Sequence, residues 1–190
     1  MCFMQTVGSF VRLGVLAVVA AYGPAAGAQE IPMPKPGPEH DVLKADAGIW
    51  DATVEVTPAP GMQPMVSKGV ETSVVGCGGL CLISDFKSEV MPGTPFHGHG
   101  ITVWDPAKKK YVGSWTDSMS TGLAIGESTY DPAAKKATGW MDAADASGQR
   151  VKARMVVEYP TPATRVMSSY MTGPDGKEFL SLKISYTRRK

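Results

Sequence analysis

The sequence predicts an all-β fold: an antiparallel, up-and-down β-barrel of about ten strands preceded by one short helix. From Gly48 onward, apolar residues recur mainly with a period of two, which is typical of strands with one buried face. Turn residues recur at short, even intervals, so about ten strand-like segments follow one another. Loops this short exclude a parallel sheet, because parallel strands need long crossover connections.

Residues 1–28 have the features of a secretory signal peptide. Arg12 is their only charged residue, an apolar run extends from Leu13 to Ala21, and Ala26-Gly27-Ala28 gives a small-x-small cleavage site. The apolar run is far shorter than the roughly 20 residues that span a bilayer. We therefore expect an exported protein, periplasmic or secreted, with no membrane span after cleavage.

The mature chain is expected to begin with a proline-rich linker, residues 29–38, followed by a single barrel domain, residues 39–190. A short helix from Glu39 to Ala47 is predicted at the start of the domain. Pro38 suits the beginning of this helix and Gly48 its end.

The strands follow in order, each ended by turn residues. In the first, WDATVEV, Trp50, Ala52, Val54 and Val56 share one face. Turns are predicted at 58–64, 76–79, 91–95, 105–109, 118–121, 131–134, 142–148, 159–162 and 173–176. Such a series of hairpins forms a sandwich or a barrel, and closure into a barrel is the simpler outcome because it leaves no exposed edge strand.

Two cysteines, Cys77 and Cys81, remain in the mature chain. In an extended strand their Cα atoms would lie about 13 Å apart, too far for a disulfide. A hairpin turn at Gly78-Gly79 would bring them together, and export would permit oxidation. The sequence leaves both arrangements open.

The charge of the mature chain argues against a nucleic-acid partner. Without Arg12 it has 18 basic and 18 acidic residues, so it carries no net positive charge to attract phosphates. The basic runs 108–110 and 188–190 are interpreted as a solvated turn and a chain end.

Several motifs spread over the mature chain are similar to those of one bacterial family. They are Pro36 to His40 (PGPEH), Gly48 to Asp51 (GIWD), Ser67 to Gly69, Gly78-Gly79, Pro95-Phe96-x-Gly98-x-Gly100, Tyr111-x-x-x-Trp115-x-Asp117-Ser118-Met119-x-Thr121, Gly173 to Lys177, and Lys183-Ile184-x-Tyr186-x-Arg188. With these motifs the chain resembles the bacterial domain of unknown function 1579 family.

This resemblance implies a calycin-like barrel, related in shape to lipocalins and nitrobindins, and implies no established activity. The Gly48-x-Trp50 pair is similar to the G-x-W opening of lipocalin barrels, where the tryptophan closes the barrel floor. Cys77, Cys81, His97 and His99 depart from the family pattern, so any chemistry they carry would be particular to this protein.

The main candidate for a ligand site is the segment YVGSWTDSMST. Tyr111, Trp115 and Asp117 share one strand face, so Trp115 could stack on a ligand while Asp117 accepts its hydrogen bond. The alternative is structural: Trp115 fills the core and Asp117 caps the following turn. Trp50 and Trp104 complete the predicted ligand-binding set.

Two histidines are the candidate metal ligands. His97 and His99 would point the same way from one strand, about 7 Å apart, but a metal site also needs a third ligand. Exposed histidines near a loop are the alternative. Haem is not expected, because the resemblance to nitrobindins would place an axial histidine after His99, where none occurs. No other cofactor is indicated.

The function we expect is the binding of a small apolar or amphipathic molecule inside the barrel. No catalytic residues are assigned, since the sequence has no nucleophile elbow, phosphate-binding loop or zinc-protease motif. Two alternatives stay open: a small hydrolase-like or isomerase-like enzyme that uses the same pocket, and a structural or partner-binding protein whose barrel is filled by side chains.

Overall fold

The structure is a computed structural model, and it describes residues 33–91, 93–144 and 149–190. The predicted signal peptide and the first residues of the predicted linker lie outside the described residues. Pro34–Lys190 forms one compact unit. Within it, residues 33–37 have no regular secondary structure and the short helix follows a turn at residues 38 and 39.

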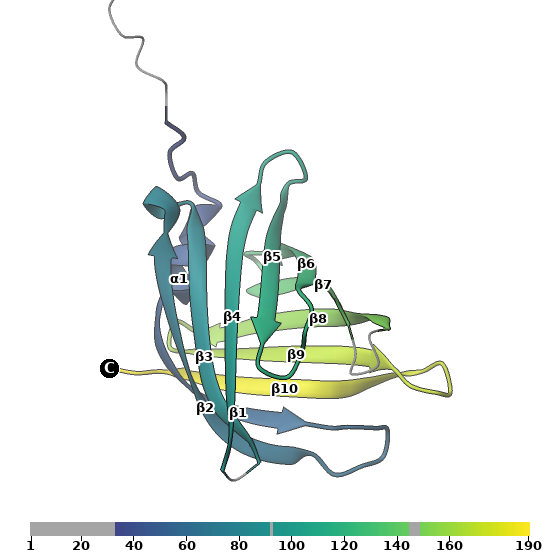
Figure 1. Cartoon of the computed structure of the whole chain (residues 1–190). Coiled ribbons are helices and arrows are strands. Elements are labelled where there is room, and N and C mark those ends of the chain that lie inside the picture. Colours follow the sequence, from purple (N-terminus) through teal and green to yellow (C-terminus); the bar gives the residue numbers. More distant parts are fainter. Residues whose placement is uncertain (1–32, 92, 145–148) are drawn as a thin grey trace, which may run out of the picture. The chain divides into compact units, whose positions relative to one another are not determined.

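Ten strands follow the helix α1 (His40–Asp46), which confirms the predicted element order (Figure 1). The strands are β1 (Gly48–Val56), β2 (Met65–Gly76), β3 (Cys81–Met91), β4 (Thr94–Asp105), β5 (Lys110–Asp117), β6 (Ala124–Asp131), β7 (Lys136–Ala144), β8 (Arg150–Thr161), β9 (Thr164–Thr172) and β10 (Glu178–Arg188), with a single turn of 3-10 helix, η1 (Cys77–Gly79), between β2 and β3.

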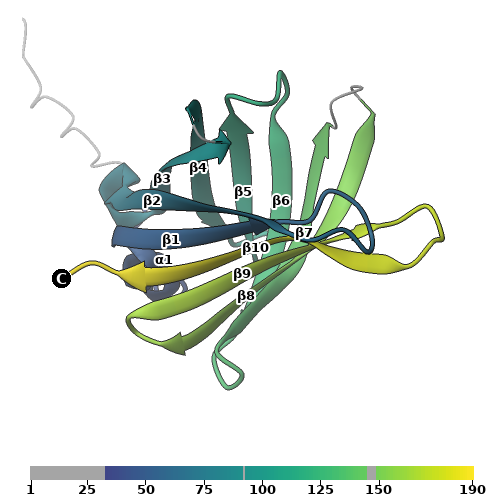
Figure 2. The same ribbon diagram turned by 90° about the horizontal axis from the view of Figure 1, so that it is seen from below.

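Each strand pairs antiparallel with its neighbours in the chain, and β1 pairs with β10 to close the barrel (Figure 2). The closing pair runs from Trp50 opposite Arg188 to Val56 opposite Leu182. This arrangement confirms the predicted up-and-down barrel and rules out the sandwich. Among the described residues, no helix is long and apolar enough to cross a membrane.

The helix α1 packs on β2, β3 and β4 and closes one end of the barrel. Leu43 lies in a cluster with Leu82 and Tyr111, and all three side chains are buried. Tyr111 also donates a hydrogen bond from its hydroxyl to the carbonyl oxygen of Glu39, at 2.7 Å. The helix is therefore tied to the barrel wall by both apolar and polar contacts.

Gly48 and Trp50 lie at the start of β1, directly after the helix in the chain. The indole of Trp50 is 2% exposed, and its Nε1 donates to the carbonyl oxygen of Asp46 at 3.0 Å. Arg188 lies over the indole ring, 4.1 Å from its centroid, and donates to the carbonyl oxygens of Ala45 and Ala47. Gly48 has a φ of 137°, a backbone conformation that residues with a side chain rarely adopt, so glycine is favoured there.

A disulfide joins Cys77 to Cys81 across η1, with the two Cα atoms 5.5 Å apart. The turn depends on left-handed backbone at Cys77, Gly78 and Gly79 (φ 54°, 66° and 97°). Glycine adopts this conformation without the steric cost of a side chain, which explains the Gly78-Gly79 pair.

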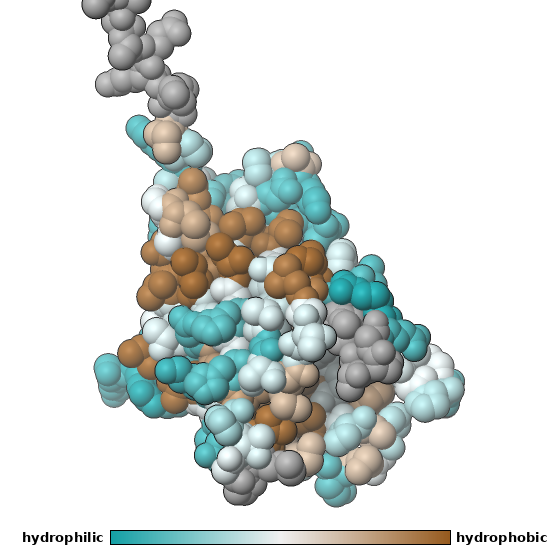
Figure 3. All heavy atoms as spheres, in the orientation of Figure 1, coloured by the Kyte–Doolittle hydropathy of each residue, from teal (hydrophilic) through white to brown (hydrophobic). Residues whose placement is uncertain are grey.

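On the outside of the barrel, apolar side chains lie side by side on β2, β3 and β4. Val74 is opposite Ile83, and Ile83 is opposite Ile101. All three are exposed, and apolar surface gathers on this face in Figure 3. Apolar residues therefore occur on both faces of these strands. The alternation of apolar and polar residues is weaker there, so the sequence alone does not show which face points into the barrel.

Candidate functional site

The barrel contains a cavity of about 660 Å³, which is partly open to solvent. Its wall comes from nearly every part of the barrel. The lining residues are Val54, Val56, Thr57, Pro58, Met65, Val66, Ser67, Phe86, Ser88, Glu89, Val90, Phe96, Trp115, Asp117, Met119, Met141, Val151, Ala153, Met155, Met167, Ser169, Met171, Ser181, Leu182, Ile184 and Tyr186. The barrel is thus hollow here rather than filled.

Apolar and aromatic side chains form most of this wall. Phe86 packs edge-to-face against Phe96 and Tyr186, with ring centroids 6.2 and 6.5 Å apart. Six methionines also line the cavity: Met65, Met119, Met141, Met155, Met167 and Met171. Methionine is flexible and polarisable, so such a wall can adapt its shape to an apolar guest.

Trp115 and Asp117, the main candidates from the sequence, both line this cavity. The Trp115 Nε1 donates to Asp117 Oδ2 at 2.9 Å, and the backbone N–H of Met119 donates to Asp117 Oδ1 at 2.9 Å. Asp117 thus faces the cavity and also caps the turn after β5, so the two sequence-based interpretations of this residue describe one arrangement.

Glycines on β4 make room for the Trp115 ring. A Cβ on Gly98 would lie 2.2 Å from Trp115 Cζ2, and a Cβ on Gly100 would lie 3.1 Å from its Cε3. The indole therefore lies against the bare backbone of β4 and is held flat on the wall. This packing could not be predicted from the two glycines alone, because it depends on the register between β4 and β5.

The other three predicted ligand residues lie elsewhere. Trp104 and Tyr111 pair across β4 and β5, with their rings 5.1 Å apart, and pack in the cluster beneath α1. Trp50 packs in a cluster with Phe86 and Tyr186, bonds to the end of α1, and lines a second pocket beside the helix. None of the three lines the cavity, although period two correctly groups Tyr111 with Trp115 and Asp117. Their common strand face could be inferred from the sequence, but their depth in the barrel could not.

A buried ionic cluster, which the sequence did not reveal, lies in the closed end. Arg165 on β9 forms ion pairs with Glu71 on β2 and with Asp46 at the end of α1, the latter at 3.1 Å. The Ser73 hydroxyl donates to Glu71 and the Tyr159 hydroxyl donates to Asp46, at 2.7 and 3.0 Å. Most of the polar atoms in this cluster therefore bond to one another.

Burial sets the electrostatics of the cluster. It raises the pKa of Asp46, against the lowering effect of Arg165, and it raises the pKa of Tyr159 and Tyr186 above their ordinary values. Burial opposes the charge on Arg165, but the carboxylates of Asp46 and Glu71 outweigh it and raise its pKa. Arg165 thus stays charged, and the cluster fixes the helix to the barrel.

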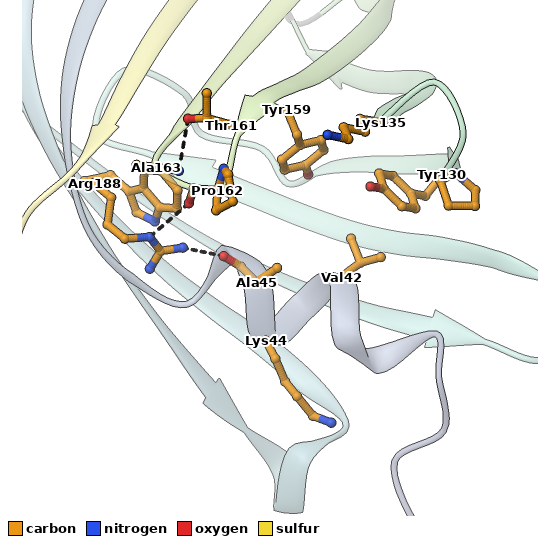
Figure 4. A pocket seen from close by; sticks show the side chains of 12 residues that line it. Val42, Lys44, Ala45, Tyr130, Lys135, Tyr159, Thr161, Pro162, Ala163 and Arg188 are labelled. Carbon is orange, nitrogen blue, oxygen red and sulfur yellow. Dashed lines mark hydrogen bonds between the residues drawn. The ribbon is translucent and has the colours of Figure 1, made fainter.

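A second, shallower pocket of about 620 Å³ lies between α1 and the hairpins β6–β7 and β8–β9 (Figure 4). Tyr130 and Tyr159 form its far wall, with their rings 5.7 Å apart, and Val42 and Ala45 of the helix face them. Lys44 points away from the tyrosines and pairs with Asp41. The guanidinium of Arg188 is already bonded to backbone carbonyls.

His97 and His99, the candidate metal ligands, are exposed on β4. His99 Nδ1 is paired with Asp85 Oδ1 on the neighbouring strand. In the described ranges, no group of three or more histidine, cysteine or acidic side chains is placed to hold a metal ion. Metal binding by this pair stays a prediction.

Fold and site together define an antiparallel, ten-stranded β-barrel with one end capped by a helix and an apolar cavity towards the other. The family model described as protein of unknown function (DUF1579) matches residues 35–188, and the chain belongs to that family. The resemblance predicted from the sequence motifs is thereby confirmed.

Solved structures share this fold at low sequence identity. The S-type phycobiliprotein lyase CPES from Guillardia theta matches 80% of this chain and 93% of its own, with 14% identity and a TM-score of 0.55. Rv2717c from M. tuberculosis matches 81% of this chain and 99% of its own, with 14% identity and a TM-score of 0.58. No curated protein sequence matches the chain.

Proposed function

We propose that this protein is an exported barrel that binds a small apolar or amphipathic molecule in its internal cavity. The observation that carries the proposal is the cavity itself, whose volume of about 660 Å³ lies within the range of roughly 300–1,000 Å³ that small-molecule sites occupy. Export rests on the signal-peptide pattern of residues 1–28.

Burial of the ligand's apolar surface would supply the affinity. Removing about 300 Å² of apolar surface from water contributes roughly 7 kcal/mol before the costs of association, at about 25 cal/mol per Å². The methionines and aromatic rings on the wall suit a guest of this kind, because they give contact area without fixed polar demands.

An enzyme that uses the same cavity is the second candidate. The observation that favours it is the shared fold with a protein named as a phycobiliprotein lyase, although identity of 14% supports likeness of fold alone. The binding proposal needs no reacting group, and the described residues of the wall include no nucleophile paired with a base. An enzyme would differ by converting the bound molecule.

Binding can be tested with a neutral, environment-sensitive naphthylamine dye that fluoresces in apolar surroundings. The full chain is expressed, and the intact mass of the purified product is recorded first; we expect it to begin at Gln29. Wild-type protein should then bind the dye at a single saturable site. Ala153→Phe, which adds a ring inside the cavity, should weaken binding at least about tenfold.

Thr138→Phe is the matched control, because it adds the same ring at an exposed position on β7, the neighbouring strand. It should leave the dye affinity unchanged. Dye binding that both variants weaken equally, or that neither weakens, would place the dye outside the cavity. A wild-type protein that binds no dye would instead support a barrel without a ligand.

A further inference from the structure

The charge on the cavity wall has one sign. Glu89 and Asp117 are the charged residues among the described residues that line the cavity, and both are acidic. In the part of the chain that the structure describes, no lysine or arginine lines it. Glu89 is exposed and Asp117 is half-buried, so an anionic head group inside the cavity would meet chiefly the like charge of Asp117, an unfavourable contact in surroundings of low polarity.

Asp117 retains the capacity to bind a further donor. Its two carboxylate oxygens each accept one hydrogen bond, from the Trp115 Nε1 and from the Met119 backbone. A carboxylate offers about four lone-pair sites, so roughly two stay available. Neither donor is charged, and in the described part of the chain no lysine, arginine or histidine forms an ion pair with Asp117 or Glu89.

Three other polar groups on the wall are already bonded within the protein. The Ser181 hydroxyl donates to the carbonyl oxygen of Ser169 at 3.1 Å, and the Ser88 hydroxyl donates to that of Lys68 at 2.8 Å. The Tyr186 hydroxyl bonds to Glu71 in the ionic cluster. Because Glu89 is exposed whereas Asp117 is half-buried, the strongest acceptor left for a ligand inside the cavity is the Asp117 carboxylate.

Trp115 adds a second attraction for positive charge at the same place. Its indole lies against β4 on one side and lines the cavity, directly beside the carboxylate that its Nε1 holds. A cation near an indole face is stabilised by the ring's electron density, by about 0.5–2 kcal/mol. A protonated amine at this position would contact a carboxylate and an aromatic ring together.

We propose that the cavity selects an amphiphile with an amine-type cationic end, which binds at Asp117 and Trp115 while its apolar part lies among the methionines. This inference rests on the proposed ligand-binding function and specifies its ligand class. The selectivity follows from charge: at Asp117 an amine gains an ion pair as well as a hydrogen bond, an alcohol gains a hydrogen bond without the ion pair, and a carboxylate is repelled.

The experiment compares decylamine, decanol and decanoate as competitors of the naphthylamine dye at neutral pH and low salt. The three compounds share one apolar chain and differ in the charge of the head group. In the wild-type protein, decylamine should displace the dye at a concentration about tenfold or more below that of decanoate, with decanol between them. Added salt should weaken decylamine and leave decanol unchanged.

Asp117→Asn should weaken decylamine about tenfold and decanol far less, and the decanol binding that remains also shows that the cavity is intact. Glu89→Gln is the matched control, because it removes the other wall carboxylate and should affect decylamine less. Equal affinity for the amine and the carboxylate, or a loss confined to Glu89→Gln, would overturn the inference while dye binding still supported the ligand-binding function. Failure of the dye itself to bind would refute both.

Discussion

At the scale of single residues, Arg165 contacts residues of the first and the last strand of the barrel. Its guanidinium lies 4.6 Å from the ring centroid of Trp50 and 4.2 Å from that of Tyr186. Glu71 is 94 positions away in the sequence, so no local pattern links the two residues. The ionic cluster could not be predicted because it depends on which strands meet across the barrel.

Arg165→Met should destabilise the protein by about 3–5 kcal/mol, because Asp46 and Glu71 would then be buried without their cation. The measurement is the free energy of unfolding in urea. Arg154→Met is the control: Arg154 also binds a carboxylate, that of Glu178, but on the surface, and its replacement should destabilise the protein far less. Similar small losses in both variants would show that the cluster contributes little.

At the scale of elements, turn chemistry made the hairpins predictable. Two turns share the pattern Asp-Pro-Ala, and in both the aspartate Oδ1 accepts two backbone N–H bonds, as Asp105 and Asp131 show. Each ends with a lysine in left-handed backbone, Lys109 and Lys135.

The turn predicted at 159–162 began too early: β8 continues to Thr161, because its pairing with β9 shifts register after Glu158.

The basic run 108–110, interpreted from the sequence as a solvated turn, is partly engaged in ion pairs. Lys108 and Lys110 donate to the two oxygens of Glu127 on β6, at 2.6 and 2.9 Å. These bonds lower the pKa of Glu127 from 4.5 to about 2. The run therefore ties the β4–β5 hairpin to the next strand, which only the register of β5 and β6 reveals.

Glu127 should make stability depend on pH in the acid range. A carboxylate whose pKa is lower in the folded state stabilises it above the unfolded pKa, and this contribution disappears as the pH falls through the folded pKa. Glu127→Gln should therefore unfold more easily than wild type at neutral pH, with the difference shrinking between pH 4.5 and about 2.

Urea unfolding of both proteins across this pH range measures the difference. Glu158→Gln is the control, because Glu158 contacts the single lysine Lys136; its difference from wild type should be smaller throughout. A difference for Glu127→Gln that stays constant down to pH 2 would show that the lysine bonds do not hold the carboxylate ionised.

At the scale of the whole molecule, the closed barrel followed from period two, short loops and even turn spacing, and all three are properties of the sequence. The cavity's position did not follow from them. Trp50, Tyr111 and Trp115 share the inward face, yet α1 fills the end that holds the first two and leaves the other end hollow. Whether an inward-facing residue lies in the filled end or in the cavity depends on where the helix packs, and the periodicity of the strands carries no information on that.

Because the cavity wall combines strands from all sides of the barrel, a bound ligand should shield distant parts of the chain at once. Met155 on β8 and Met167 on β9 line the cavity, whereas Met62 is 55% exposed and does not. Hydrogen peroxide converts accessible methionine to the sulfoxide. Saturation with the dye should slow oxidation of Met155 and Met167 several-fold and leave Met62 unchanged.

Peptide mass spectrometry after timed peroxide treatment gives the rate at each methionine. The sulfoxide is polar, so protein oxidised at the wall before dye is added should also bind it more weakly. Protection of Met62 alone would place the dye on the surface, and equal protection everywhere would indicate general tightening of the fold. Protection limited to the wall methionines would locate the ligand in the cavity without any substitution, because Met155 and Met167 lie on different strands and both line that cavity.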